Sequence, residues 1–189
     1  MLTAAHILPR PPRPDQPACG HVLDPAGHRA PRAAPAPRGT MAAMTRGTPR
    51  RRKQPRSASG TPAPSTCPCG SGQPYAACCG RFHSGVALAP TAEALMRSRY
   101  SAFAVRDEGY LLRTWHPRTR PAGVAFAAGL GWTGLEIEAT EAGSAFHARG
   151  VVRFRAHFTD GGRAGVLRER SRFEREAGAW VYVDGDIDP

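Results

Sequence analysis

The first 66 residues of the chain contain no aromatic residue and only 2 acidic residues, against 11 lysines and arginines and 13 of the 19 prolines. A segment of this composition buries too little apolar surface to offset the entropy that ordering costs. We therefore predict that residues 1–66 form a disordered tail. The tail carries +9 (11 basic minus 2 acidic residues), which leaves +2 (15 minus 13) for residues 67–189, so the folded part is expected to be nearly neutral.

The sequence also lacks any apolar run long enough for a signal peptide or a membrane span, and prolines at 9, 11, 12, 14 and 17 interrupt its first residues. We expect a cytoplasmic protein with no membrane partner. The run Arg50-Arg51-Arg52-Lys53 predicts at most weak, salt-sensitive contact with nucleic acid, because it offers charge but nothing that reads bases. Met41 and Met44 precede this run, which leaves open a start of translation there.

Cysteine is scarce and concentrated: Cys67, Cys69, Cys78 and Cys79 fall within thirteen residues, and the fifth, Cys19, lies in the tail. In a reducing cytosol, clustered thiols more often hold a metal than form disulfides. Zn²⁺ takes four thiolate or imidazole ligands tetrahedrally, and two close pairs of cysteines complete such a site with no position left for water. The pattern therefore predicts a structural zinc site at these four cysteines.

The residues around the cysteine pairs suit a tight metal loop, because Gly70 and Gly72 permit positive φ values. His83, four residues after Cys79, is an alternative fourth ligand, since imidazole also binds zinc. Four free buried thiols without a metal are the other alternative. We predict that residues 67–85 form a zinc knuckle.

The stretch from Cys67-Pro68-Cys69-Gly70-Ser71-Gly72 to Cys78-Cys79-Gly80 resembles the SEC-C motif, the zinc-binding module at the C-terminus of the bacterial preprotein translocase ATPase. Five later blocks extend the likeness, and together they resemble the bacterial YchJ family over residues 67–189. Some members of that family carry a second SEC-C motif at the C-terminus, whereas residues 67–189 contain one. The blocks are Leu95–Phe103, Tyr110-Leu111, Thr114–Pro117, Glu169–Phe173 and Trp180–Gly185.

The resemblance implies a zinc knuckle followed, over residues 91–189, by a nuclear-transport-factor-2-like (cystatin-like) domain. This is an α+β fold in which a cone of curved antiparallel sheet wraps around helices. The resemblance implies no particular reaction. Because the motif of the translocase contacts a chaperone and the ribosome, it implies protein or ribosomal partners for the knuckle by analogy alone.

The residue pattern independently indicates an α+β domain. A helix is expected after Thr91, which can cap it, and a second helix from Asp107 to Trp115, which Pro117 ends. Alternating apolar residues then predict four strands, over residues 132–139, 151–158, 166–173 and 180–183, with turns at Asp160–Gly162 and Ala177-Gly178.

Strand alternation turns two polar residues, Glu169 and Ser171, toward the core. A buried carboxylate needs a partner or a proton, and the first helix offers Arg97 and Arg99. We predict an ion pair between Glu169 and Arg99 that joins sheet to helix. The alternative is that Glu169 lines a ligand pocket.

A conical domain of this type often encloses a ligand cavity at its open end. His116 is the candidate for proton transfer, because a histidine titrates near neutrality, with a pKa of about 6.5. A histidine after a helix also caps terminal carbonyls, and no catalytic residue is assigned. The candidate lining residues of the pocket are Tyr100, Tyr110, Trp115, His116, Trp132, Glu169, Ser171 and Tyr182.

Three functions are compatible with these features. The leading hypothesis is a non-enzymatic, zinc-containing binding or adaptor protein that contacts protein or ribosomal partners. The second is a small-molecule-binding domain, or an enzyme, that uses the conical pocket for an unidentified ligand. The third is a nucleic-acid-associated protein that uses the basic tail and the basic residues of two neighbouring strands, Arg153, Arg155, His157, Arg168, Arg170 and Arg172.

Overall fold

The computed structural model describes residues 63–188. The predicted tail, with Cys19, lies almost entirely outside the described residues. The cysteine-rich segment contains a 3-10 helix, η2 (Tyr75–Ala77), and a short helix, α1 (Gly80–His83). Two further helices follow, α2 (Ala92–Val105) and α3 (Glu108–Arg113). The strands are β1 (Leu130–Ala142), β2 (Arg149–Asp160), β3 (Arg163–Glu176) and β4 (Ala179–Asp188).

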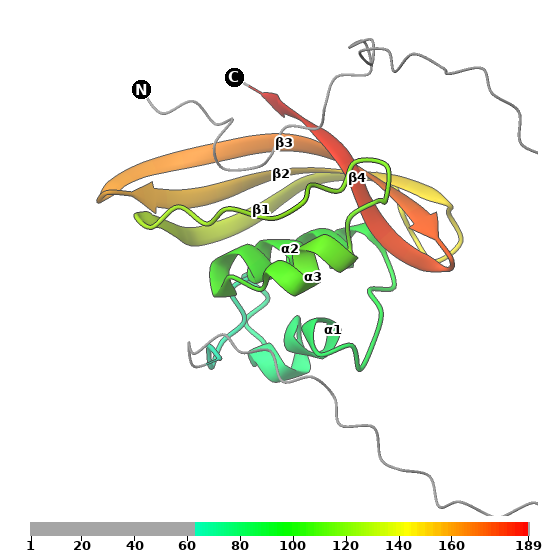
Figure 1. Cartoon of the computed structure of the whole chain (residues 1–189), viewed down its shortest axis with the longest axis horizontal. Helices are drawn as coiled ribbons and strands as arrows, with labels where there is room; N and C mark the ends of the chain where they lie inside the picture. The colour runs from blue at the N-terminus through cyan, green and yellow to red at the C-terminus, as the bar shows by residue number, and fades with distance from the viewer. Residues whose placement is uncertain (1–62, 189) are drawn as a thin grey trace, which may run out of the picture. The chain divides into compact units, whose positions relative to one another are not determined.

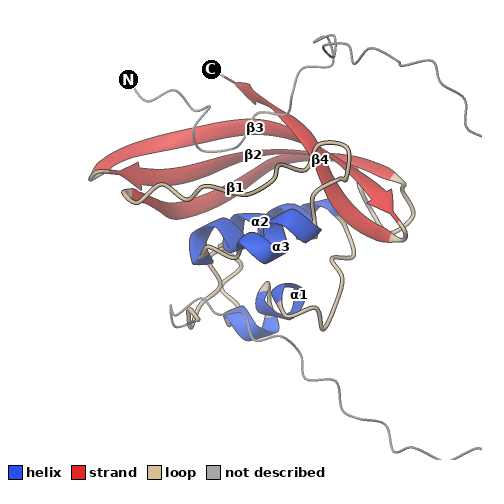
Figure 2. Ribbon diagram, in the orientation of Figure 1, coloured by secondary structure: helices blue, strands red, loops and turns tan. Residues whose placement is uncertain are grey.

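The four strands form one curved antiparallel sheet in the order β1-β2-β3-β4, and α2 and α3 lie against one of its faces (Figure 1, Figure 2). Two-residue turns join β2 to β3 and β3 to β4. Gly161 and Gly162 have φ values of 54° and 83°, and Ala177 and Gly178 have 49° and 84°. Positive φ at both central residues matches the twist of the flanking strands, so these turns set the register of both hairpins.

Local signals in the sequence fix the limits of the two main helices. The Thr91 side chain accepts a 3.1 Å hydrogen bond from the Ala94 amide at the start of α2, and Asp107 accepts one of 2.9 Å from Tyr110 at the start of α3. Helix α2 ends where Arg106 adopts left-handed backbone angles, with φ of 57° and ψ of 40°. Among residues 63–188, no helix has both the length and the apolar character that crossing a bilayer requires.

The core lies between the sheet and the helices. Along β3, side chains alternate between the core and the outer face, and Glu169 and Ser171 point inward as predicted. The α+β fold predicted from the sequence is thereby confirmed. The principal apolar side chains of this core are Leu95, Tyr100, Leu111, Trp115, Val152, Phe154, Leu167, Phe173 and Trp180.

The sheet has three register shifts, of which one lies in β1 between Ile137 and Ala139 and two change the surroundings of the side chains discussed below. One interrupts β1 between Trp132, which pairs with Phe158, and Gly134, which pairs with His157. The other lies between β3 and β4, where Phe173 pairs with Tyr182 but Arg172 pairs with Asp184. The extra residue in β4 reverses the alternation, because a bulge places two residues opposite one.

The Arg175 side chain forms hydrogen bonds with loops that lie far apart in the sequence. Its guanidinium donates to the carbonyl oxygens of His147 (3.1 Å) and Gly178 (2.8 Å), and to those of Pro90 and Ala145 (3.3 Å each). These groups belong to the segment before α2, the β1–β2 loop and the β3–β4 turn. One side chain therefore joins the β1–β2 loop and the β3–β4 turn to the residues that precede α2.

Candidate metal centre

The four predicted ligands come from three short backbone features. Cys67 and Cys69 lie in a loop that the 2.9 Å hydrogen bond from the Cys67 amide to the Gln73 carbonyl closes. Gly70 and Gly72 turn this loop with φ values of 77° and 73°, a region that disfavours residues with a Cβ. Cys78 follows η2 directly, and Cys79 is the N-cap residue of α1.

This backbone brings the four sulfur atoms together within 4.8 Å of one another. The Sγ atom of Cys69 is 3.6 Å from that of Cys78, and the Sγ atom of Cys78 is 3.9 Å from that of Cys79. At a zinc–sulfur distance of about 2.3 Å, neighbouring sulfurs of a tetrahedron lie about 3.8 Å apart. The spacing of the thiols therefore fits a tetrahedral metal ion.

The chemistry of the donor set also fits a metal. The hydrogen bond with the Cys79 thiol lowers the pKa of Cys69 to about 4. The same interaction raises the pKa of Cys79. A divalent cation that displaced the thiol protons would neutralise the thiolates at the same place.

The sulfur cluster is attached to α2 of the following domain. The Sγ atom of Cys67 is 3.6 Å from the Ser101 hydroxyl, and Arg97 donates a 3.2 Å hydrogen bond to the carbonyl oxygen of Cys69. Cys67, Cys69 and Cys79 are buried, whereas Cys78 is half-buried. The knuckle is therefore supported by the domain on its inner side.

His83, the alternative ligand, has both ring nitrogens engaged elsewhere. Its Nδ1 atom is 2.7 Å from the Tyr75 hydroxyl, and its Nε2 atom is 2.8 Å from the carbonyl oxygen of Ser98. A carbonyl only accepts, so Nε2 carries the proton and Nδ1 accepts from Tyr75. Burial lowers the pKa of His83, in keeping with this neutral form. In this arrangement the histidine links the knuckle to α2, and Cys79 is the fourth sulfur of the cluster.

Glu169 lies at the centre of a second, buried group of polar side chains. Its Oε1 atom accepts hydrogen bonds from Ser171 (2.6 Å) and from Tyr182 (3.0 Å). Its Oε2 atom is buried without a hydrogen-bond partner among the described residues, as is Nε1 of Trp115. Burial is the main cause that raises the pKa of Glu169. The group therefore has the surroundings of a protonated carboxyl.

The predicted ion pair between Glu169 and Arg99 is wrong. Arg99 instead donates 2.9 Å hydrogen bonds to the carbonyl oxygen of Leu111 and to the hydroxyl of Thr114. Its Cζ atom lies 4.6 Å from the centre of the Tyr182 ring. The tyrosine thus separates the cation from the acid, and each has other partners.

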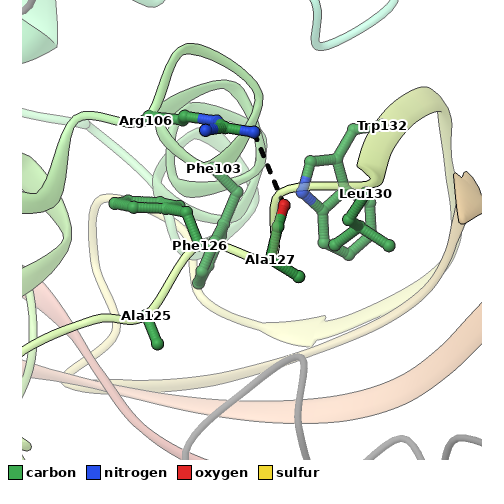
Figure 3. Close-up of a pocket in the computed structure, with 7 residues that line it drawn as sticks. All are labelled: Phe103, Arg106, Ala125, Phe126, Ala127, Leu130 and Trp132. Atoms are coloured by element: carbon green, nitrogen blue, oxygen red, sulfur yellow. Dashed lines mark hydrogen bonds between the residues drawn. The ribbon is translucent and has the colours of Figure 1, made fainter.

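The predicted pocket residues do not surround one cavity. Tyr100, Tyr110, Trp115, His116, Glu169, Ser171 and Tyr182 are buried in the packed interior. Trp132, by contrast, borders a small hollow with Phe103, Arg106 and Phe126 (Figure 3). These three neighbours of Trp132 were not predicted from the sequence: Phe126 lies in a segment without periodicity, Arg106 follows the helix, and Phe103 lies in its last turn.

His116 lies among backbone groups and acids. Its Nδ1 atom accepts a 3.1 Å hydrogen bond from the Arg118 amide, and its own amide donates to the Tyr182 carbonyl at 2.7 Å. Its Nε2 atom is 3.7 Å from a carboxylate oxygen of Glu176 and 4.0 Å from one of Glu174. These contacts position the residues after α3 against the sheet.

The arginines on the outer face of β2 and β3 are flanked by acids on β1 and β4. Arg170 pairs with Glu141 at 3.2 Å, and Arg172 pairs with Asp186 at 2.6 Å. Arg155 likewise pairs with Glu138. This face is therefore a mixed charged surface and not a uniformly basic one, which does not favour the nucleic-acid hypothesis.

Comparisons with known proteins agree with both parts of the structure. A SEC-C motif matches residues 65–81, and the YchJ middle NTF2-like domain matches residues 91–185. A UPF0225 protein from Streptomyces avermitilis is 65% identical over 126 residues, which cover 67% of this chain and 87% of the relative.

Two solved structures are also similar. The solution structure of a SEC-C motif containing protein from Rhodopseudomonas palustris is 32% identical, with a TM-score of 0.59, and the match covers 66% of this chain and 99% of that one. The crystal structure of a SEC-C motif containing protein from Psychrobacter arcticus is 26% identical, with a TM-score of 0.55, over 67% and 85% of the two chains. The chain therefore belongs to the YchJ family, with a SEC-C motif preceding its NTF2-like domain.

Proposed function

We propose that the protein holds one zinc ion at Cys67, Cys69, Cys78 and Cys79 and acts as a non-enzymatic binding protein, whose knuckle contacts protein or ribosomal partners. The observation that carries the proposal is the closed cluster of four sulfurs. Zinc with four thiolate ligands has no open position at which to activate water, so its role would be to shape the loop.

The arrangement of the knuckle supports a contact role. Its inner side is attached to α2 through Ser101, Arg97 and His83. Its outer side presents exposed residues, including Gln73 and Arg81. A metal that fixes the loop would hold this outer surface in one shape, which lowers the entropy lost when a partner binds. The choice of a protein or ribosomal partner rests on the resemblance to the motif of the translocase.

Native mass spectrometry and elemental analysis of the full chain test the metal. We expect one zinc per chain, and loss of that zinc when Cys67 and Cys78 are both changed to serine. Gln73→Ala is the matched control, because its side chain is exposed and the backbone carbonyl that closes the loop is retained. Zinc well below one per chain after expression with ample zinc, or retention of full zinc by the double serine variant, would refute the site.

Co-sedimentation with purified ribosomes, together with cross-linking in cell extract, tests the partner class. Arg81→Glu reverses an exposed charge on the knuckle and leaves all four cysteines in place. We expect this variant to keep its zinc and to lose the contacts that the unmodified protein makes through the knuckle. Cross-links that map only to the sheet, and persist in the zinc-free protein, would contradict the proposal.

A further inference from the structure

A hollow opens between the C-terminal end of α2 and the beginning of β1 (Figure 3). Aromatic side chains form its walls. The rings of Phe103 and Phe126 meet edge to face with centroids 6.3 Å apart, and those of Phe103 and Trp132 lie 6.1 Å apart. Leu130 extends the apolar lining. Such a surface favours a flat or aliphatic group over a polar one.

A cation without an acidic partner lies at the edge of this hollow. Arg106 is exposed, and no ion pair in the described part of the chain includes it. Within residues 63–188 the guanidinium makes one hydrogen bond, and it is long, 3.5 Å from Nη2 to the Ala127 carbonyl. Its backbone has a φ of 57°, a conformation uncommon for residues other than glycine and asparagine. The left-handed turn places a guanidinium with most of its donors free beside an apolar surface.

Trp132 contributes a second donor. Its indole N–H makes no hydrogen bond within residues 63–188, and in Figure 3 the nitrogen edge of the ring faces the side where Arg106 and Ala127 lie. The β-bulge between Trp132 and Gly134 falls directly after this residue. Bulges often redirect a neighbouring side chain near functional sites. The hollow thus combines two free donors at one edge with aromatic walls.

The geometry points to a binding site for a small monocarboxylate that carries an aromatic ring. A guanidinium binds a carboxylate through two parallel N–H bonds, and the indole N–H can add a third. A single cation matches a single negative charge. The ring of the ligand would pack edge to face against Phe103 and Trp132, the geometry that aromatic pairs prefer. This inference is independent of the zinc knuckle.

The hollow, with Phe126 as one of its walls, is smaller than such a ring. The open volume is about 20 Å³, which is room for about one water molecule and not for a ring. The segment around Phe126 is held on one side by the 2.9 Å hydrogen bond from the Val124 amide to Glu108. On the other side it is held by the 3.3 Å bond from the Leu130 amide to the Ala127 carbonyl. Rotation of the Phe126 side chain would admit the ligand without breaking either bond.

Titration of the full-length, zinc-loaded protein with phenylacetate tests the site, read by calorimetry and by the NMR signal of the Trp132 indole N–H. We expect saturable one-to-one binding, and a loss of about tenfold or more in affinity for Arg106→Gln, since one charge-assisted pair contributes roughly that much. Arg168→Gln, which removes an exposed arginine on the outer face of β3, is the matched control and should bind normally. Phe126→Ala should bind more tightly, because it opens the hollow.

Two further ligands test whether binding depends on the carboxylate charge or only on the aromatic ring. The neutral 2-phenylethanol should bind more weakly and should not distinguish Arg106→Gln from the unmodified protein, whereas phenyl phosphate should gain nothing over phenylacetate. The inference is overturned if neither the unmodified protein nor Phe126→Ala saturates with phenylacetate up to about 10 mM. Equal weakening by Arg106→Gln and Arg168→Gln, or a shift that spares Trp132, would overturn it as well.

Discussion

The hydroxyl of Tyr182 donates a 3.0 Å hydrogen bond to Oε1 of Glu169. The tyrosine takes the place that a direct ion pair with Arg99 was expected to occupy. Burial raises the pKa of the carboxyl group, and a raised pKa means that the neutral form is favoured inside the protein. Glu169 is therefore a buried, neutral acid, and the hydroxyl groups of Ser171 and Tyr182 supply its hydrogen bonds.

Glu169→Gln is expected to cost less than about 1 kcal/mol of unfolding free energy, because glutamine keeps the size of a neutral acid and the oxygen that accepts from Ser171 and Tyr182. Glu169→Ala should cost about 2–4 kcal/mol, since it leaves a cavity and two unpaired hydroxyls. Urea unfolding of the zinc-loaded protein measures both.

Double-mutant cycles serve as the control for that result. The coupling of Glu169→Ala with Tyr182→Phe should be about 1 kcal/mol, and that with Arg99→Met should be smaller. A larger coupling to Arg99 would mean that the direct pair exists in solution and that the hydroxyl network is secondary.

The protonation of Glu169 also predicts a pH dependence. The folded state binds the proton more tightly than the unfolded state, whose pKa is near 4.5. The contribution of the residue is therefore complete below pH 4.5 and is lost as the pH rises through the higher pKa of the folded state. The unmodified protein should lose stability relative to Glu169→Gln over that interval. Measuring the pH profile of unfolding for both proteins cancels the contribution of other titrating groups, and two parallel profiles would show that folding does not change the pKa of Glu169.

Gly185→Ala should destabilise the fold by about 2 kcal/mol or more, as overpacking in a core does. Gly185 pairs with Ser171, and a Cβ atom there would overlap the Glu169 carboxyl group. Combining the change with Glu169→Ala should recover part of the loss, because the new methyl group then enters the vacated space. Thermal unfolding of the two single variants and the double variant checks this, and strictly additive losses would argue against the close approach.

Removal of zinc should lower the melting temperature of the whole domain by several degrees, because the knuckle is attached to α2 through His83 and Arg97. Calorimetry with and without a chelator measures the shift. The Cys67→Ser, Cys78→Ser variant should be insensitive to the chelator. A domain transition that does not move on chelation, in a protein shown to have lost its metal, would mean that knuckle and domain are energetically independent.

Deletion of residues 1–62 should leave the melting temperature and the zinc content unchanged, because the tail has no aromatic residue with which to pack. The full-length protein measured in the same buffer is the reference. A fall of more than a few degrees would show that the tail binds the domain.

The periodic parts of the fold were predictable from the sequence. Alternation placed Glu169 and Ser171 inside, and the first long helix begins at its predicted cap, Thr91. The cysteine spacing likewise predicted which four thiols would meet. Each of these features depends on residues that are close together in the sequence: the alternation of one strand, the cap of one helix or the spacing within one loop.

The partners of Glu169 were not predictable because they depend on the register of two strands. The bulge opposite Arg172 makes Tyr182 and Gly185 share the inner face of β4 although they are three residues apart. Strict alternation would instead have paired Tyr182 with Asp184 on that face. The segment from Pro117 to Gly129 has no hydrophobic period, so the position of Phe126 against Phe103 was not predictable from the sequence either.

The contacts of Arg175 have a consequence for the order in which the chain folds. Consecutive strands joined by tight turns pair locally and can form early, whereas the bond from Arg175 to Pro90 spans 85 residues and the bond from Trp180 to the same carbonyl spans 90. Closing a loop of that length costs chain entropy, so these bonds are expected to form only after both ends have been brought together by other contacts. The contacts of the Arg175 guanidinium therefore form late in folding, after the transition state. Their removal should raise the unfolding rate far more than it lowers the folding rate.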